Sequence, residues 1–138
     1  MNAREMTAQE HTQTALEFLD ASDREFAAGE RLQASEKLYG AATHIVTAIA
    51  QQRAWQYRSH RAMKNAVFRL EQEHNDPLIL AGFLAAEDFH KNFFHNDMEE
   101  YEIEQERPVV HRFVSRMLAL INETASTDSD RAGKETAP

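Results

Sequence analysis

Apolar residues recur three or four positions apart in several stretches of the chain, which is the spacing of an amphipathic helix. The first stretch follows Thr7 and Glu10, a pair spaced as in a capping box. Its apolar positions are Ala15, Leu16, Leu19 and Phe26. This pattern predicts a helix over about 8–28, and Gly29 suits the turn after it.

Three more helices follow from similar signals. A stripe of small and branched apolar residues predicts a second helix over about 31–52. Ser59 fits the N-cap of a third helix that ends near His74. Asn75, Asp76 and Pro77 read as a turn, an N-cap and a proline at the first helical position, which predicts a fourth helix from 77 to about 96.

The end of the chain changes character twice. The acidic run from Glu99 to Glu106 predicts a short helical turn, and Pro108 fits the first turn of a last helix over 107–122. After Thr124 the residues are mostly Ser, Thr, Asp, Gly and Lys, with no apolar anchor. We expect that part of the chain to be disordered.

Only four Gly and three Pro interrupt the 138 residues, and this favours helix over sheet. Short links between successive helices favour antiparallel neighbours. The sequence therefore predicts an all-α fold, an up-and-down antiparallel bundle of about five helices. We expect a flexible N-terminus over 1–7, a single bundle domain over 8–122 and a disordered C-terminal tail over 123–138.

Composition excludes several classes of chemistry. Without cysteine there can be no disulfide, no thiolate metal site and no cysteine nucleophile. Fifteen basic against 23 acidic residues give a net charge of −8, which opposes loose attraction to phosphate backbones. The chain contains no run of about 18 apolar residues and does not start like a secretory signal, so we expect a cytoplasmic protein with no membrane partner.

The stretch FHKNFFHND, residues 89–97, carries two imidazoles, a lysine and an amide among three phenylalanines. Positions 79, 82, 86, 89 and 93 share one helix face and are expected to face the core. His90 borders that face, with Glu87 one turn earlier as its expected partner. His95 lies ~140° further round, on the polar side with Asn92. The two histidines should therefore point to different places.

Two Glu-x-x-His units, Glu71 to His74 and Glu87 to His90, have the spacing that di-iron bundles use. His74 should lie at the turn between the third and fourth helices. His90 should lie about 13 residues along the fourth helix, or ~20 Å away. That separation argues against a shared metal, and we expect neither a metal site nor a cofactor.

The same antiparallel arrangement puts position 90 level with 61 or 62, which brings RSHR beside HKNFFH. Imidazoles titrate near neutral pH and arginines bind anions, so this end of the bundle could handle a phosphate. The candidates for catalysis are His60, His90, His95 and Arg58. The candidates for ligand binding are Arg58, His60, Arg61, Lys64, Lys91, Asn92, His95, Trp55 and Tyr57. The two aromatic rings could stack on a nucleobase, or cover the bundle end or a partner's surface.

The succession ASEKLYGAATHIVTAIA, YRSHRAMKNAV and AAEDFHKNFFHND resembles the small helical proteins of the HEPN-like superfamily, nearest to its PaREP-type branch. The resemblance covers about residues 20–120. It implies a helical bundle, frequently a homodimer, linked to nucleotide binding and in many members to metal-independent RNA cleavage. The cleaving members carry an Arg, a polar residue and a His, with four to six residues between the Arg and the His, and no Arg stands at that spacing before His95.

Three functions stay open from the sequence. The first is a non-catalytic, dimeric HEPN-like module that binds a nucleotide, a nucleic acid or a protein. The second is a metal-independent ribonuclease that uses His60, His90 or His95 as general acid or base, with Arg58 stabilising the charge on the reacting phosphate. The third is a helical protein-interaction adaptor with no link to nucleotides.

Overall fold

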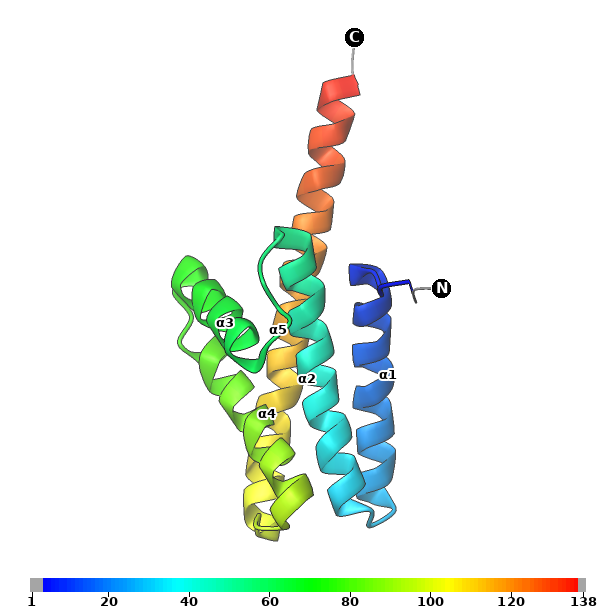
Figure 1. The fold of residues 1–138 in the computed structure, drawn as a ribbon, viewed down its shortest axis with the longest axis vertical. Helices are drawn as coiled ribbons and strands as arrows, with labels where there is room; N and C mark the ends of the chain where they lie inside the picture. The colour runs from blue at the N-terminus through cyan, green and yellow to red at the C-terminus, as the bar shows by residue number, and fades with distance from the viewer. Residues whose placement is uncertain (1–3, 137–138) are drawn as a thin grey trace.

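Five α-helices account for most of the chain, and the computed structural model describes residues 4–136, with side chains as far as residue 127. In chain order they are α1 (Ala8–Ala27), α2 (Arg31–Arg53), α3 (His60–His74), α4 (Leu78–His95) and α5 (Glu100–Thr136). The described residues contain no strand, so the predicted all-α class is confirmed. Figure 1 shows α1 on one side of α2 and both α3 and α4 on the other.

Local chemistry sets several helix ends where the sequence predicts them, although Pro77 is the N-cap of α4 and not its first residue. Thr7 Oγ1 accepts the Glu10 N–H at 3.1 Å, and the Glu10 carboxylate accepts the Thr7 N–H at 3.1 Å, which completes the capping box. Ser59 caps α3 by accepting the Ala62 N–H at 3.0 Å. Asn75 and Asn96 end α3 and α4 with φ of 49° each, a left-handed conformation that asparagine tolerates.

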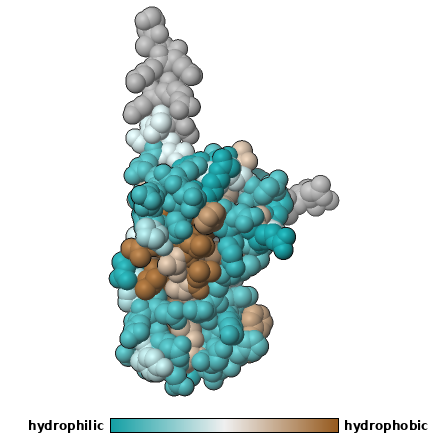
Figure 2. All heavy atoms as spheres, turned by 90° about the vertical axis from the view of Figure 1, so that its left-hand side faces the viewer, coloured by the Kyte–Doolittle hydropathy of each residue, from teal (hydrophilic) through white to brown (hydrophobic). Residues whose placement is uncertain are grey.

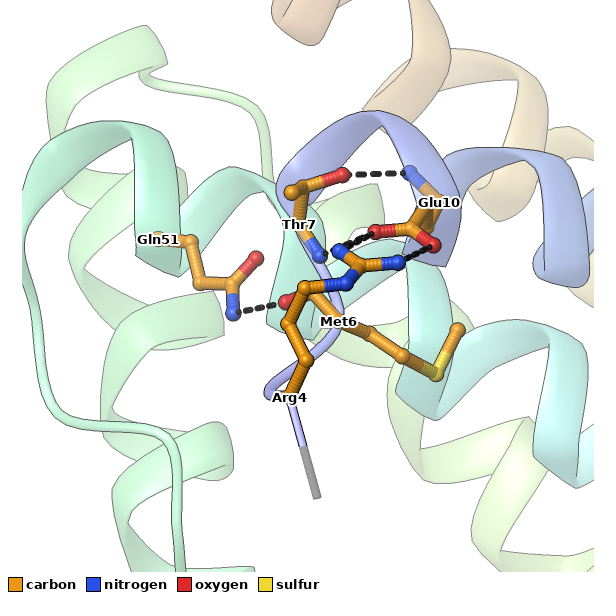
Figure 3. A network of polar contacts seen from close by, with 5 residues as sticks. All are labelled: Arg4, Met6, Thr7, Glu10 and Gln51. Atoms are coloured by element: carbon orange, nitrogen blue, oxygen red, sulfur yellow. Dashed lines mark hydrogen bonds and ion pairs between the residues drawn. The ribbon is translucent and has the colours of Figure 1, made fainter. Parts of the chain in front are cut away.

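The chain before α1 makes specific contacts (Figure 3). Arg4 donates to both Glu10 carboxylate oxygens, at 2.7 and 2.8 Å, and Gln51 donates to the Met6 carbonyl at 2.9 Å. The Arg4 side chain and then the Thr7 N–H lower the pKa of Glu10 to about 2. Residues 4–7, for which we expected flexibility, thus lie against the C-terminal end of α2, and residues 1–3 fall outside the described part of the chain.

The core forms around α2, which is buried along much of its length. Small residues on its surface let neighbouring helices approach closely, and a Cβ added to Gly40 would meet the Phe18 ring of α1 at 2.7 Å. A similar approach joins α4 to α5, where a Cβ on Gly82 would lie 2.6 Å from Phe113 Cβ. Phe83 and Phe89 of α4 fill the space between α4 and the rest of the bundle and are fully buried.

The last helix is longer than predicted at both ends. α5 begins at Glu100 instead of 107 and encloses Pro108 in its interior. Ile103 and Val110 explain why, because they lie two turns apart on one face and are 2% and 0% exposed. Their burial continues the apolar stripe across the proline, whose missing N–H removes one helical hydrogen bond.

Residues 123–136, for which we expected disorder, continue α5 beyond the bundle (Figure 1). Residues 137 and 138 lie outside the described part of the chain. Among the described residues, no helix combines the length and the apolar character that crossing a membrane requires.

Candidate functional site

A network of histidines and carboxylates joins α2, α3 and α4. His60, the first residue of α3, directs Nε2 to the Glu87 carboxylate of α4 and Nδ1 to the Tyr39 hydroxyl of α2 at 3.2 Å. Lys64, one turn further along α3, lies 3.4 Å from the same Glu87 carboxylate. Both ring nitrogens of His60 therefore have partners, and the Glu87 carboxylate lies close to two basic side chains.

His90 takes a partner that the sequence did not predict. Its Nδ1 lies 3.0 Å from the Glu36 carboxylate of α2, so the expected pairing with Glu87 is wrong. Its ring also stacks on Tyr39, with centroids 4.1 Å apart. Burial, and then the charges of Glu87 and Glu36, raise the pKa of Tyr39.

Arg58 and Tyr57 lie apart from the histidine–carboxylate network, which consists of Glu36, Tyr39, His60, Lys64, Glu87 and His90. The Arg58 guanidinium and the Tyr57 hydroxyl both donate to the Glu5 carboxylate, and Arg58 also lies 5.2 Å from the centroid of the Tyr57 ring. These hydrogen bonds, that from Tyr57 first, lower the pKa of Glu5 against the opposing effect of burial. The candidate pairing of Arg58 with His60 at one phosphate has no counterpart among these contacts.

The candidate site residues on the second half of α4 do not come together at one site either. His95 is exposed, as its predicted helix phase requires, and Lys91 lies 3.7 Å from Asp97. Asn92 was expected on the polar side and is instead fully buried. Its amide donates to Ser35 Oγ at 3.1 Å and its carbonyl accepts the Met98 N–H at 2.8 Å, so it fastens the link between α4 and α5 to α2.

A second cluster surrounds Trp55 in the link before α3. The Arg69 guanidinium lies 4.2 Å from the centroid of the Trp55 ring, and that of Arg53 lies 5.3 Å from it. Both arginines also approach Glu73, at 2.8 Å for Arg53 and 3.6 Å for Arg69. Both guanidinium groups thus lie within cation–π distance of the indole.

Trp55 and Arg69 border a cavity of about 360 Å³, which we call the tryptophan pocket. Arg61 and Asn65 of α3 add polar groups to its lining, as do Gln56 and Ser59 of the link before α3. Residues 61, 65 and 69 are spaced by four, which places the two arginines and the amide on one face of α3. Small side chains at Ala62 and Ala66 leave the space between this face and the indole open.

The sequence had indicated Trp55 and Arg61 as ligand candidates but not Asn65 or Arg69. The four-residue spacing of Arg61, Asn65 and Arg69 was the signal that could have found them. Nothing in the sequence could show that the indole lies over this face of α3, because Trp55 reaches it through an irregular link.

The groups of the tryptophan pocket suit anion recognition. Within the part of the chain that the structure describes, no group of three or more His, Asp or Glu side chains is placed to hold a metal ion. The tryptophan pocket combines two guanidinium groups, two side-chain amides and an aromatic surface, which suit a planar base linked to a phosphate.

One comparison with known proteins identifies a family. The model of the archaeal PaREP1/PaREP8 family matches residues 10–114, which include α2, α3 and α4 and hence both the histidine–carboxylate network and the tryptophan pocket. No curated protein and no solved structure matches the chain.

Proposed function

The chain belongs to the archaeal PaREP1/PaREP8 family, and we propose that it is a non-catalytic, HEPN-like helical module that binds a nucleotide in the tryptophan pocket. One observation carries the proposal: Arg61, Asn65 and Arg69 share a face of α3 that closes on Trp55 around about 360 Å³. This volume lies within the range of small-molecule sites.

The parts of the pocket have distinct roles in this proposal. The nucleobase stacks on the guanidinium plane of Arg69, which Trp55 supports from behind at 4.2 Å. The Asn65 amide offers a donor and an acceptor to the edge of the base. Arg61 is exposed and free to turn its guanidinium toward the phosphate. A net charge of −8 disfavours a long nucleic acid as the ligand.

Trp55 is the only tryptophan, so its fluorescence reports on this pocket alone. We expect adenosine monophosphate to change the emission saturably, and adenosine and ribose 5-phosphate to bind more weakly because each lacks half of the contacts. Arg61→Ala should weaken binding about tenfold through the lost charge-assisted hydrogen bond. Arg24→Ala removes an exposed arginine from α1 and serves as the charge-matched control.

Two results would count against nucleotide binding. One is an emission that none of the three ligands changes. The other is an equal loss of affinity in Arg24→Ala and Arg61→Ala, which would mean that only the overall charge matters. Tighter binding of a short RNA than of the mononucleotide would identify a polynucleotide as the ligand in place of a free nucleotide.

Self-association is part of the proposal. Figure 2 shows hydrophobic side chains gathered on the face that α3 and α4 form, and Phe68 and Leu84 of these helices are 49% and 42% exposed. A dimer that pairs this face with its copy would cover them. Sedimentation at tens of micromolar should give twice the 15.8 kDa of one chain, and Phe68→Glu should give the monomer. A monomer in the unaltered protein would contradict the dimer.

A ribonuclease is the second candidate, and one observation favours it. Glu36 engages Nδ1 of His90, which leaves Nε2 as the nitrogen that could exchange a proton with a ligand. Incubating the purified protein with RNA, with and without a chelator, tests this function directly. Cleavage that resists the chelator and disappears in His90→Ala would establish it and displace the non-catalytic proposal.

A further inference from the structure

An apolar groove lies between the start of α4 and the middle of α5. Its cavity measures about 460 Å³ and its walls are largely apolar. Ile79 and Phe113 are buried at 1% and 3% exposure, whereas Leu78 on the rim is 72% exposed. Leu78 is the most exposed of the large apolar side chains that the structure describes. The apolar rim of this groove is therefore exposed to solvent.

Close packing beneath the groove keeps its shape. Gly82 lies so near α5 that a Cβ there would meet Phe113 Cβ at 2.6 Å. The two helices are therefore in contact along this line, and neither can move inward to close the space. The packing of α4 against α5 therefore keeps the groove open.

The charge around the groove is positive, although the protein is acidic overall. Arg112 and Arg116 lie one helical turn apart on α5, and Asp76 is the one acidic residue of the lining. Asp76 already accepts from Arg116 at 3.4 Å and from the Leu78 N–H at 3.1 Å. Among the described residues, Arg112 has no carboxylate within ion-pair distance. Two guanidinium groups against one carboxylate leave a local charge of +1 in a chain of −8.

We propose that this groove binds an aliphatic carboxylate of medium length. The apolar chain lies along Leu78, Ala81 and Val109, and the carboxylate pairs with Arg112 at the rim. Charge complementarity supports an anion over a neutral or cationic amphiphile, since one guanidinium stands beside apolar walls. The site is separate from the tryptophan pocket, so this proposal does not depend on nucleotide binding.

Calorimetric titration of the full chain with octanoate, octanol and octylammonium, each below its micelle-forming concentration, tests both parts of the site. Octanoate should bind most tightly and octylammonium least. Arg112→Ala should weaken octanoate about tenfold and leave octanol unchanged. Arg24→Ala, which removes the same charge from α1, should leave all three unchanged. Ala81→Phe, at an exposed position of the groove wall, should fill the space and weaken all three ligands.

Circular dichroism of each variant separates a lost site from a lost fold, because only a variant with the helical spectrum of the unaltered protein is compared. The proposal is overturned if octanol or octylammonium binds as tightly as octanoate, or if no octanoate binds. It is equally overturned if Ala81→Phe binds octanoate as the unaltered protein does, since the ligand would then lie elsewhere.

Discussion

The imidazole of His90 stacks on the phenol ring of Tyr39, with centroids 4.1 Å apart and planes inclined by 22°. The hydroxyl of the same tyrosine lies 3.2 Å from Nδ1 of His60. One aromatic side chain of α2 thus holds a histidine from α3 and a histidine from α4. Each histidine also meets a carboxylate, Glu87 for His60 and Glu36 for His90, so the network ties three helices together at one level.

His90→Ala should lower the free energy of unfolding by about 1–3 kcal/mol. The substitution removes the stack on Tyr39 and leaves the half-buried Glu36 carboxylate without its imidazole. Urea unfolding of both proteins measures the difference. His95→Ala is the matched control, because this exposed imidazole ends the same helix and its loss should change stability by less than about 0.5 kcal/mol. Equal losses in the two variants would contradict the structural role of His90.

Two glycine substitutions should differ in their effect on stability, although each adds one methyl group to a helix. Gly82→Ala places a Cβ 2.6 Å from Phe113 Cβ, which is fixed to the α5 backbone, so helix displacement should cost about 1–3 kcal/mol. Gly40→Ala meets the Phe18 ring, which can rotate away, and it gains up to about 1 kcal/mol of helix propensity. Thermal melts should show Gly82→Ala clearly destabilised and Gly40→Ala nearly unchanged. The opposite order would contradict rigid α4–α5 packing.

Stability should fall on mild acidification because of His11 and His44, whose Nδ1 atoms lie 2.8 Å apart. Burial lowers the pKa of both, and for His44 the charge of His11 lowers it further. Their contribution is complete above the ordinary histidine pKa of about 6.5 and is lost as the pH falls from there through the folded-state pKa. The free energy of unfolding in urea should differ less between pH values above and below about 6.5 in His44→Phe than in the unaltered protein. His44→Phe keeps a ring against Phe18 but cannot titrate at that position. His95→Phe should keep the full difference, and a flattened response there would reject the assignment.

Glu106 should lower the stability of the protein as the pH rises, the opposite of the effect of the two histidines. Burial, and then the neighbouring Asp88 and Glu102, raise the pKa of Glu106 to about 8. A carboxyl with a raised pKa contributes stability that is complete below its ordinary pKa and is lost as the pH rises through about 8. Glu106→Gln keeps a neutral side chain at every pH. It should therefore melt at a higher temperature than the unaltered protein above pH 8 and lose that advantage in acid. A difference in melting temperature that stays the same at every pH would mean that Glu106 does not titrate in this range.

The helix boundaries that the sequence predicted best are those with a local cause. Thr7, Ser59 and the turn at Asn75 act on backbone groups within three residues, so the residue types alone indicate them. The start of α5 was mispredicted because Pro108 is a strong local signal for a helix start. The burial of Ile103 outweighs it, and that burial depends on tertiary contacts that the sequence does not display.

The candidate site was predictable in its residue types and not in its grouping. Helix spacing placed His95 correctly on the exposed side, but polarity alone put Asn92 there as well, although its spacing of three from Phe89 suits the buried face. Which partners meet depends on side-chain directions between helices. For that reason His90 pairs with Glu36 and Arg58 pairs with Glu5, two partners that helix spacing does not predict.

Deleting residues 125–138 should leave the melting temperature within about 2 °C of that of the full chain. Among the residues whose side chains the structure describes, the last hydrogen bond from another helix to α5 lies before the cut: Gln52 of α2 donates to the Ile121 carbonyl at 3.2 Å. Residues 125–127 are exposed, and the composition beyond them supplies no apolar anchor. Far-ultraviolet circular dichroism before and after the deletion shows whether the segment was helical in solution, and the melt shows whether it mattered to the fold.

A fall of several degrees would mean that the segment docks on the bundle or on a second copy. Removing residues 118–138 instead is the positive control, because it takes away Leu120 and Ile121, which are 1% and 7% exposed, and should destabilise the protein severely.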